Sequence, residues 1–260
     1  MKIPIYQVDA FTSEVFGGNP AAVCPLNEWI DKDTMQKIAM ENNLSETAFF
    51  VPKEDYFEIR WFTPKVEINL AGHPTLASAW VIYNELKYKK PGIRFKSPLS
   101  GDLIITKDQD LLIMDFPSNE GKVITPPVSL VEGLGAEPVE VLQSRDLLVI
   151  YKNQQEIENI KPDFGILEKV ETFGIIVSAP GDDCDFVSRF FAPRAGINED
   201  PVTGSAHTTL IPYWAQKSQK NILEAIQLSP RRGKLKCEYL GNRVSIGGTA
   251  RLFMKGVIVI

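Results

Sequence analysis

Apolar residues recur mostly with a period of two along this chain, which predicts a structure built largely from β-strands. In residues 56–62, for example, Phe57, Ile59 and Trp61 fall on one face of an extended segment. Similar runs between turn-forming residues predict further strands. They cover residues 3–11, 47–51, 93–96, 102–106, 111–116, 139–143, 146–151, 175–178, 186–191, 234–239, 243–246 and 252–260.

Helical spacing is less frequent. Asp31 can cap a helix whose apolar face is Met35, Ile38 and Ala39. A second helix is predicted to begin at Gly72 and run to about residue 86; it is apolar almost all round, so we expect it to be buried against a sheet. Two more are predicted, around 163–170 and after Gly204. Strands gathered around one buried helix per half favour an α+β fold.

One stretch of the chain occurs twice. Arg60-Trp61-Phe62-Thr63-Pro64-Lys65 is matched 129 residues later by Arg189-Phe190-Phe191-Ala192-Pro193-Arg194. Ile-Asn follows in both copies, at residues 68–69 and 197–198, and then a glycine at the start of a predicted helix. A repeat at half the chain length predicts a duplicated domain with a site between the halves. A proline-rich linker after residue 117 divides an N-terminal lobe, 1–117, from a C-terminal lobe that begins at residue 118.

Composition narrows the class of protein. A net charge of −5 and a pI near 5.3 argue against a nucleic-acid partner. Three widely spaced cysteines form no disulfide or zinc pattern, and a reducing cytoplasm suits them. The first residues lead into a strand and not a signal peptide, and no apolar run could span a bilayer. We therefore expect a soluble cytoplasmic protein without a membrane partner.

The two helix starts are the first candidates for chemistry. Gly72 and Gly204 hold matching places in the repeat, and His73 and Ser205 follow them directly. A helix start offers unpaired N–H groups and partial positive charge, so two of them facing one cleft would bind a carboxylate. A glycine that opens a helix is more often structural, and only the pairing favours function. With two histidines in all and no metal-binding motif, we expect no metal.

Two carboxylates and one histidine complete the candidates. Asp200 lies in a connection of 15 residues where the first copy has 12, and this insertion carries a second acid, Glu199. The alternative is an Asp-Pro turn with a helix-capping role. Glu46 is flanked by apolar residues; desolvation there would raise its pKa toward the range that a general acid or base needs, although a glutamate is usually structural. His207 is expected to be a core or hinge residue.

Five motifs together resemble the PhzF family of phenazine biosynthesis-like proteins, which shares the diaminopimelate epimerase fold. They occur in family order across most of the chain. The motifs are Asp9-Ala10-Phe11 with Gly18-Asn19-Pro20-Ala21, Asn43-Leu44-Ser45-Glu46-Thr47-Ala48-Phe49, Arg60-Trp61-Phe62-Thr63-Pro64, Gly72-His73-Pro74-Thr75, and Asp200-Pro201-Val202-Thr203-Gly204-Ser205-Ala206.

The resemblance implies two pseudo-symmetric lobes, each a mixed β-sheet wrapped around a central helix, with the site in the cleft between them. It implies that the last strand, 250–260, returns to complete the first lobe, which leaves 118–249 as the second. It also implies a homodimer and an isomerase that needs neither metal nor organic cofactor. The best-known member isomerises trans-2,3-dihydro-3-hydroxyanthranilate with a glutamate that moves a proton between carbons, which would be Glu46. The residues that hold the substrate would be His73, Asp200 and Ser205, with Gly72, Gly204 and Asn19 beside them.

Two departures limit the resemblance. Diaminopimelate epimerase uses two facing thiols, and here neither helix-opening motif contains a cysteine, which argues against a two-thiol racemase. The segment 65–70 varies among family members and is consistent with a substrate other than the phenazine precursor. Two alternatives stay open. One is a binding protein without chemistry; the other is a hydrolase with Ser205 as nucleophile, although Gly-x-Ser-x-Gly is absent.

Overall fold

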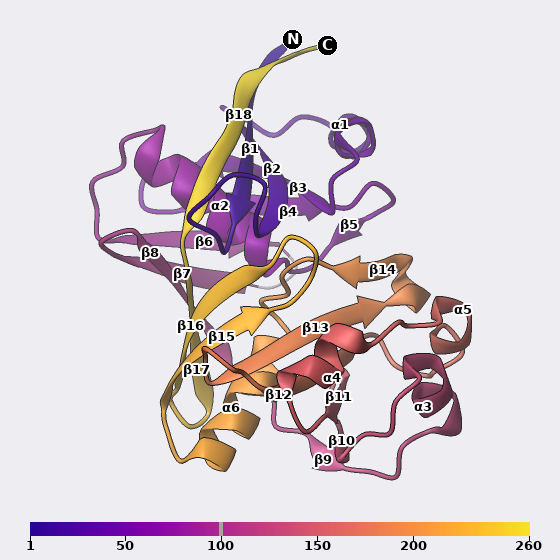
Figure 1. The fold of residues 1–260 in the computed structure, drawn as a ribbon. Helices are drawn as coiled ribbons and strands as arrows, with labels where there is room; N and C mark the ends of the chain where they lie inside the picture. The colour runs from indigo at the N-terminus through magenta and orange to yellow at the C-terminus, as the bar shows by residue number, and fades with distance from the viewer. Residues whose placement is uncertain (99–100) are drawn as a thin grey trace. The chain divides into compact units, whose positions relative to one another are not determined.

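The chain folds into two compact units in a computed structural model that describes residues 1–98 and 101–260. The first unit comprises Met1–Asp115 and Gly247–Ile260, and the second Phe116–Ile246. Figure 1 traces the chain through both. Both combine strands with few helices, so the α+β class is confirmed. Among the described residues, no helix is long and apolar enough to cross a membrane.

The first unit is a mixed sheet. Its strands follow the order β18-β1-β2-β3-β4-β6-β7, and β5 pairs with β4 as a short antiparallel addition. The β2–β3 and β4–β6 pairs are parallel, while the other pairs are antiparallel. The elements are β1 (Lys2–Ala10), β2 (Asn19–Pro25), α1 (Lys32–Asn42), β3 (Glu46–Pro52), β4 (Phe57–Phe62), β5 (Glu67–Ile68), α2 (Gly72–Asn84), β6 (Gly92–Ser97), β7 (Gly101–Asp108), β8 (Leu111–Pro117), which pairs with β7, and β18 (Ala250–Val259).

The helix α2 forms the centre of this unit. It packs against β1, β2, β3 and β18, and ten of its 13 residues are buried. Because it has no polar face, it is stable only when the sheet covers it on most sides, as its sequence predicts. The helix α1 covers an outer face, capped by Asp31, whose side chain accepts a hydrogen bond from the Thr34 amide at 2.8 Å. The predicted apolar face of α1 is confirmed.

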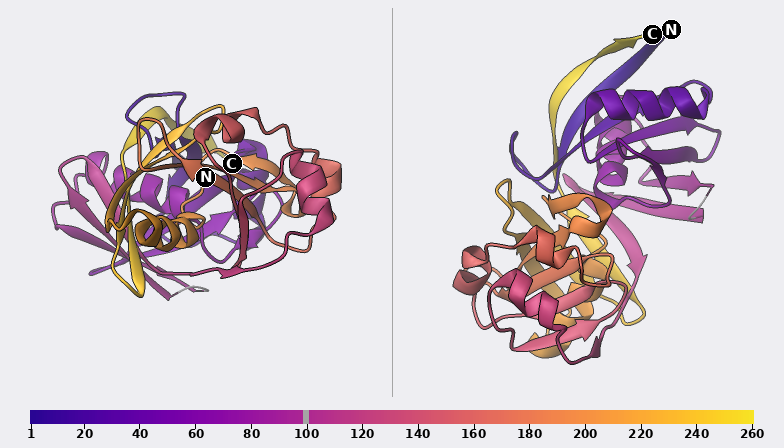
Figure 2. Two further views of the ribbon diagram at one scale, coloured as in Figure 1. Left: turned by 60° about the horizontal axis from the view of Figure 1, so that its bottom comes forward. Right: turned by 90° about the vertical axis from the view of Figure 1, so that its right-hand side faces the viewer.

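The last strand of the chain completes the first unit. β18 pairs antiparallel with β1 along its whole length, from Lys2 opposite Val259 to Ala10 opposite Ala250. The two chain ends therefore lie side by side, as Figure 2 shows. A β-bulge between Gln7 and Val8 interrupts the register.

The second unit is also a mixed sheet, in the order β9-β10-β11-β12-β13-β15-β16. Its helix α6 lies against β15 and β16, and Trp214 of α6 stacks on Phe186 and donates a 2.9 Å hydrogen bond to Ser178. The elements are β9 (Lys122–Val123), α3 (Val128–Leu134), β10 (Glu140–Gln143), β11 (Leu147–Ile150), α4 (Gln154–Asn159), α5 (Phe164–Leu167), β12 (Ile175–Pro180), β13 (Phe186–Ala192), the 3₁₀ turn η1 (Pro193–Ala195), β14 (Ile197–Asp200), α6 (His207–Ser218), β15 (Ile222–Gln227), β16 (Gly233–Tyr239) and β17 (Arg243–Gly248).

The strand pairings repeat between the units. In the first, β2 and β3 are parallel, β3 and β4 antiparallel, β4 and β6 parallel, and β6 and β7 antiparallel. In the second, the same alternation runs through β11, β12, β13, β15 and β16. In each unit the central helix stands in the connection that makes a parallel crossover, β4 to β6 or β13 to β15. This shared order supports the duplication that the sequence repeat predicts.

A bidentate arginine–glutamate ion pair also occurs once in each unit. The Arg60 guanidinium donates two hydrogen bonds to Glu67, at 2.7 and 2.9 Å, and Arg189 donates two to Glu199, at 2.8 and 3.0 Å. Each arginine lies over a phenylalanine ring of its own strand, Phe62 or Phe191. The pair joins β4 to β5 in one unit and β13 to β14 in the other.

This pair corrects the alignment of the two copies. Glu199 is the counterpart of Glu67, so the extra residues of the second copy lie before it, around η1, and do not include a second functional acid. The strand register agrees, because Ile68 lies opposite Trp61 and Asp200 lies opposite Phe190. Asp200 therefore takes the place that Ile68 has in the first unit, and the match of the two Ile-Asn dipeptides is wrong. A carboxylate stands where the other half has an apolar side chain.

Other differences concern short elements. The helices α3 and α4 and the strands β2, β5, β9, β14 and β15 are additions to the predicted set, and the helix expected over 163–170 is shorter, at Phe164–Leu167.

Candidate functional site

Glu46 stands at the start of a buried strand. The helix α1 ends at Asn43, whose left-handed conformation (φ 48°) turns the chain toward β3. Glu46 is the first residue of β3 and pairs with Ala21 of β2, and the next five residues of β3 are all buried. The Glu46 side chain is itself 9% exposed. The strand thus carries a carboxylate into an apolar setting, as the sequence predicts.

His73 meets this carboxylate. As the second residue of α2 it is 6% exposed, and its Nε2 lies 3.1 Å from Oε2 of Glu46. The two atoms are in contact but do not form a hydrogen bond with each other. A buried acid and a buried base are thus in contact at the start of the central helix.

The protonation of His73 follows from its surroundings. Burial lowers the pKa of His73 to about 3, against the opposing effect of a hydrogen bond to the backbone of Pro20. Since Pro20 has no N–H, its carbonyl must accept this bond from an imidazole N–H. At neutral pH the ring is therefore neutral, with one nitrogen donating to Pro20, and Nε2 faces Glu46 as an acceptor.

Asn19 and Gly72 belong to the same group of residues. Asn19 is fully buried at the start of β2 and precedes the proline that binds His73. Gly72 is the first residue of α2, directly before His73. The first unit therefore brings together four of the seven predicted site residues: Asn19, Glu46, Gly72 and His73.

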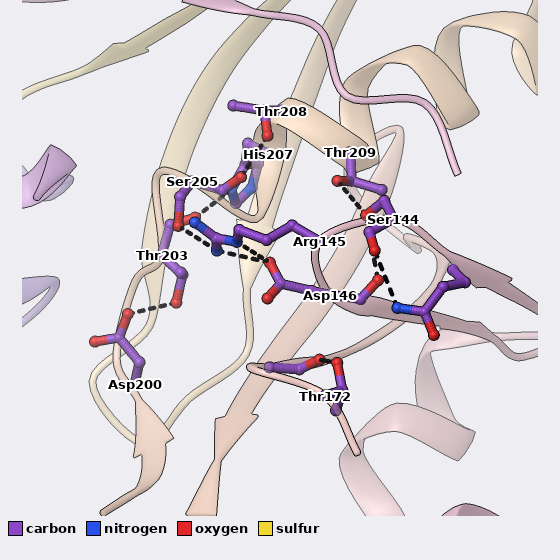
Figure 3. A network of polar contacts seen from close by, with 12 residues as sticks. Ser144, Arg145, Asp146, Thr172, Asp200, Thr203, Ser205, His207, Thr208 and Thr209 are labelled. Atoms are coloured by element: carbon purple, nitrogen blue, oxygen red, sulfur yellow. Dashed lines mark hydrogen bonds and ion pairs between the residues drawn. The ribbon is translucent and has the colours of Figure 1, made fainter. Parts of the chain in front are cut away.

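In the second unit, Asp200 ends β14 and enters a short braced loop. Its carboxylate accepts a hydrogen bond from the Thr203 hydroxyl, drawn in Figure 3. Gln227, at the end of β15 and fully buried, holds both sides of the loop. Its amide donates to the Asp200 carbonyl at 2.7 Å and to the Thr203 hydroxyl at 3.2 Å, and its oxygen accepts from the Thr203 amide at 2.9 Å. The conformation of the Asp200 loop is therefore fixed by a neighbouring strand.

Ser205 contacts a charged pair that the sequence analysis missed. Arg145 donates a 3.1 Å hydrogen bond to Ser205 Oγ and two to Asp146 Oδ2, at 2.7 and 3.1 Å (Figure 3). Asp146 is 1% exposed, while the Arg145 side chain is 47% exposed. The signal available in the sequence was the polar tripeptide Ser144-Arg145-Asp146 between two apolar strands, since polar loops on a rigid scaffold often carry function.

The start of α6 differs from the prediction. Gly204 does not begin the helix; the first helical residue is His207, and Gly204–Ala206 form a turn with i to i+3 hydrogen bonds. His207 is fully buried, its Nδ1 bonds the Thr203 carbonyl at 2.9 Å, and burial lowers its pKa to about 4. It is a neutral core residue, as expected, and it secures the turn that presents Ser205.

These contacts argue against the hydrolase alternative. A serine nucleophile needs a base that accepts its proton. The hydrogen bond made to the Ser205 side chain comes from Arg145, which can only donate, and the Nδ1 of the following histidine is engaged by the Thr203 carbonyl.

The predicted residues thus form two groups, one in each unit, and their union in one cleft stays a prediction. Across residues 1–98 and 101–260, no group of three or more His, Cys, Asp and Glu side chains is arranged to hold a metal ion.

Comparison with known proteins places this geometry in a family. The profile of the phenazine biosynthesis-like proteins, PhzC-PhzF, matches residues 8–256. The chain is 47% identical to an uncharacterized isomerase of Pseudomonas aeruginosa over 258 residues, 99% of each chain. It is 46% identical to the crystal structure of a PhzF family protein from Enterococcus faecalis, with a TM-score of 0.98 and complete coverage of both chains.

A more distant likeness concerns the fold alone. A hydroxyproline epimerase from Agrobacterium vitis, crystallised with bound trans-4-hydroxy-L-proline, is 7% identical with a TM-score of 0.64, over 99% of this chain and 92% of that one. With its matching motifs, its duplicated mixed sheets around central helices and its full-length relatives, the chain belongs to the phenazine biosynthesis-like (PhzC-PhzF) family.

Proposed function

We propose that this protein is a cofactor-independent isomerase that moves a proton between carbons of a small amino- or hydroxy-carboxylic acid. Relatives named as isomerases support isomerisation in general. The finer assignment rests on one observation, the buried contact between Glu46 and neutral His73 at 3.1 Å. Glu46 takes a proton from one carbon of the substrate and returns it to another.

The contact gives Glu46 a place to hold a proton between the two steps. His73 donates its ring N–H to Pro20, so Nε2 is the acceptor for a protonated Glu46. A protonated Glu46 therefore has an acceptor within hydrogen-bond distance, whereas its carboxylate form and Nε2 would be two acceptors facing each other. A general acid–base must be able to adopt both protonation states, and the contact with His73 favours the protonated state of Glu46.

The residues of the second unit bind the rest of the substrate in this proposal. Asp200, in its braced loop, would accept hydrogen bonds from an amino or hydroxyl group, and Ser205 would bind the carboxylate with the free N–H groups at the start of α2. The exclusion of water around these groups would strengthen each interaction. The family resemblance also favours a homodimer in which each protomer carries its own site.

The test is hydrogen exchange at carbon. Amino- and hydroxy-acids, with dihydrohydroxyanthranilate among them, are incubated with the protein in D₂O, and mass spectrometry detects deuterium at C–H positions. We expect incorporation into at least one acid by wild type and a loss of at least 100-fold in Glu46→Gln, because general acid–base catalysis contributes on the order of 10²–10⁴.

Two comparisons make the test decisive. Glu41→Gln changes an exposed glutamate of the neighbouring helix α1 and should exchange as fast as wild type. If Glu46→Gln exchanges at the wild-type rate, the assignment of the acid–base is wrong. If wild type binds several of these acids and exchanges none, the protein is a binding protein without this chemistry.

A further inference from the structure

The Arg145 guanidinium is held in a fixed direction. Asp146 accepts two hydrogen bonds from it through Oδ2, and the buried position of Asp146 limits its movement. Asp146 has room because residue 174 is a glycine: a Cβ there would lie 2.9 Å from Oδ1. The guanidinium also lies over the Phe173 ring, 5.0 Å from its centroid. The hydrogen bonds to Asp146 along one edge and the contact of one face with Phe173 together give the guanidinium a defined orientation.

The backbone under Arg145 is also fixed. The Ser144 hydroxyl lies 3.1 Å from that of Thr209 on α6, and its amide donates to the Asp146 carbonyl at 2.9 Å. Figure 3 shows this loop and the start of α6 joined by these contacts. Arg145 and Ser205 are therefore positioned relative to each other by the same helix.

One edge of this arginine is unused by the protein. Nε and Nη2 make all the hydrogen bonds to Asp146 and Ser205, and Nη1 has no hydrogen-bond partner among residues 1–98 and 101–260. The Arg145 side chain is 47% exposed, so a ligand can approach these free donors from solvent.

The contact also orients the Ser205 hydroxyl. Its oxygen accepts a hydrogen bond from Arg145, so its own proton points elsewhere and can be donated. Arg145 and Ser205 together present donors only, which suits an anion. Among the proposed substrate-binding side chains, Glu46 and Asp200 are acids and His73 is neutral, so this set holds no positive charge of its own.

We propose that Arg145 is a specificity-determining residue that binds the substrate's carboxylate directly through Nη1 and through the hydroxyl of Ser205. This proposal rests on the proposed function for the assumption that the ligand is a carboxylic acid. If Arg145 binds the carboxylate, an acid should bind more tightly than the neutral amide of the same shape. A hydrogen bond from a charged donor contributes about tenfold in affinity when, as here, the donor is half exposed.

The test compares matched acids and amides. Ligand-observed NMR titration measures the binding of anthranilate, salicylate and mandelate, each beside its primary amide. We expect wild type to bind at least one acid about tenfold more tightly than its amide. Arg145→Gln should remove this preference. Arg145→Lys should keep part of it, because lysine retains the positive charge but lacks the planar guanidinium group with its paired N–H donors.

The controls address folding and nonspecific charge. Arg145→Gln leaves Asp146 buried without its partner, so the double variant Arg145→Gln/Asp146→Asn, which removes both charges, should give the same loss. Arg232→Gln removes an arginine that is 65% exposed and should leave the preference unchanged. A wild type without any preference for acids, including one that binds neither form, overturns the proposal. A preference for acids that survives in both Arg145→Gln and Arg145→Gln/Asp146→Asn would also overturn the proposal.

The outcome is separate from that of the exchange experiment. Glu46→Gln should keep the preference for acids while it loses deuterium incorporation. If wild type prefers acids through Arg145 but never exchanges hydrogen, the isomerase proposal fails and the carboxylate site stands.

Discussion

Replacement of Gln227 by leucine is the sharpest test of how the second unit holds Asp200. Leucine has a similar size but neither donates nor accepts a hydrogen bond. The change therefore keeps the packing of β15 and removes three hydrogen bonds to the loop at residues 200–203. It removes the Gln227 side chain as a hydrogen-bond partner of the Thr203 amide and of the Asp200 carbonyl.

The expected cost follows from these two backbone groups. An unsatisfied buried polar group costs about 1–3 kcal/mol. Thr203 is 7% exposed, so its amide bears most of this cost, whereas Asp200 is only half-buried and water can reach its carbonyl in part. We therefore expect Gln227→Leu to lower the free energy of unfolding by about 2–4 kcal/mol. A loosened loop should also lower kcat on any substrate found by the exchange assay, because a displacement of 1 Å can cost about 10²-fold.

Urea denaturation monitored by circular dichroism measures the free energy of unfolding. Gln155→Leu is the matched control, because the Gln155 side chain is exposed and donates a hydrogen bond to Asn159 within one helix; the change should cost less than about 0.5 kcal/mol. If Gln227→Leu is as stable as Gln155→Leu, the loop is held by other contacts and Gln227 has no positioning role.

Three further predictions use other parts of the chain. The imidazoles of His73 and His207, with pKa values of about 3 and 4, stay neutral in the folded protein but ionise below about pH 6.5 in the unfolded chain, so the free energy of unfolding should fall from pH 6.5 toward pH 4. His207→Gln should make the urea midpoint less dependent on pH over this range. A variant whose urea midpoint depends on pH as strongly as that of wild type would contradict this prediction. Gly174→Ala places a Cβ 2.3 Å from an aromatic carbon and should lower stability by about 1–3 kcal/mol in urea titrations, whereas Gly92→Ala, with no heavy atom nearer than 3.8 Å, should not. Homodimerisation predicts a light-scattering mass near twice 29.1 kDa, and a wild-type monomer would refute this prediction.

The elements that the sequence predicts well are those whose burial pattern is complete within a short window. The strand from Phe57 alternates in burial as far as Trp61, and α2 is apolar on almost every side, so period and composition identify both. The strand β15 is different, because its inward face is Leu223, Ala225 and Gln227. One of these three inward positions, Gln227, is polar and bonds the loop at residues 200–203, so a search for alternating hydrophobic residues does not identify this strand.

The site is predictable to a similar extent and for a similar reason. Glu46 and His73 lie in local motifs, and their contact follows from the pairing of β2 with β3 and the position of α2. Arg145 is 60 residues from Ser205 in sequence, and nothing local to either residue indicates that they touch. The true place of Asp200 in the repeat depends on strand register, which residue counting misassigns by the length of η1.

The return of β18 to β1 has a consequence for how the protein is made. On the ribosome, the second unit, Phe116–Ile246, is continuous and is complete before the final strand emerges. The first unit begins synthesis earlier but lacks the partner of its first strand for on the order of 10 s at ordinary translation rates. During that interval the edge of β1 is open to any other strand, so we expect chaperones to contact the first unit for longest. The half of the protein that is translated first is therefore the half that matures last.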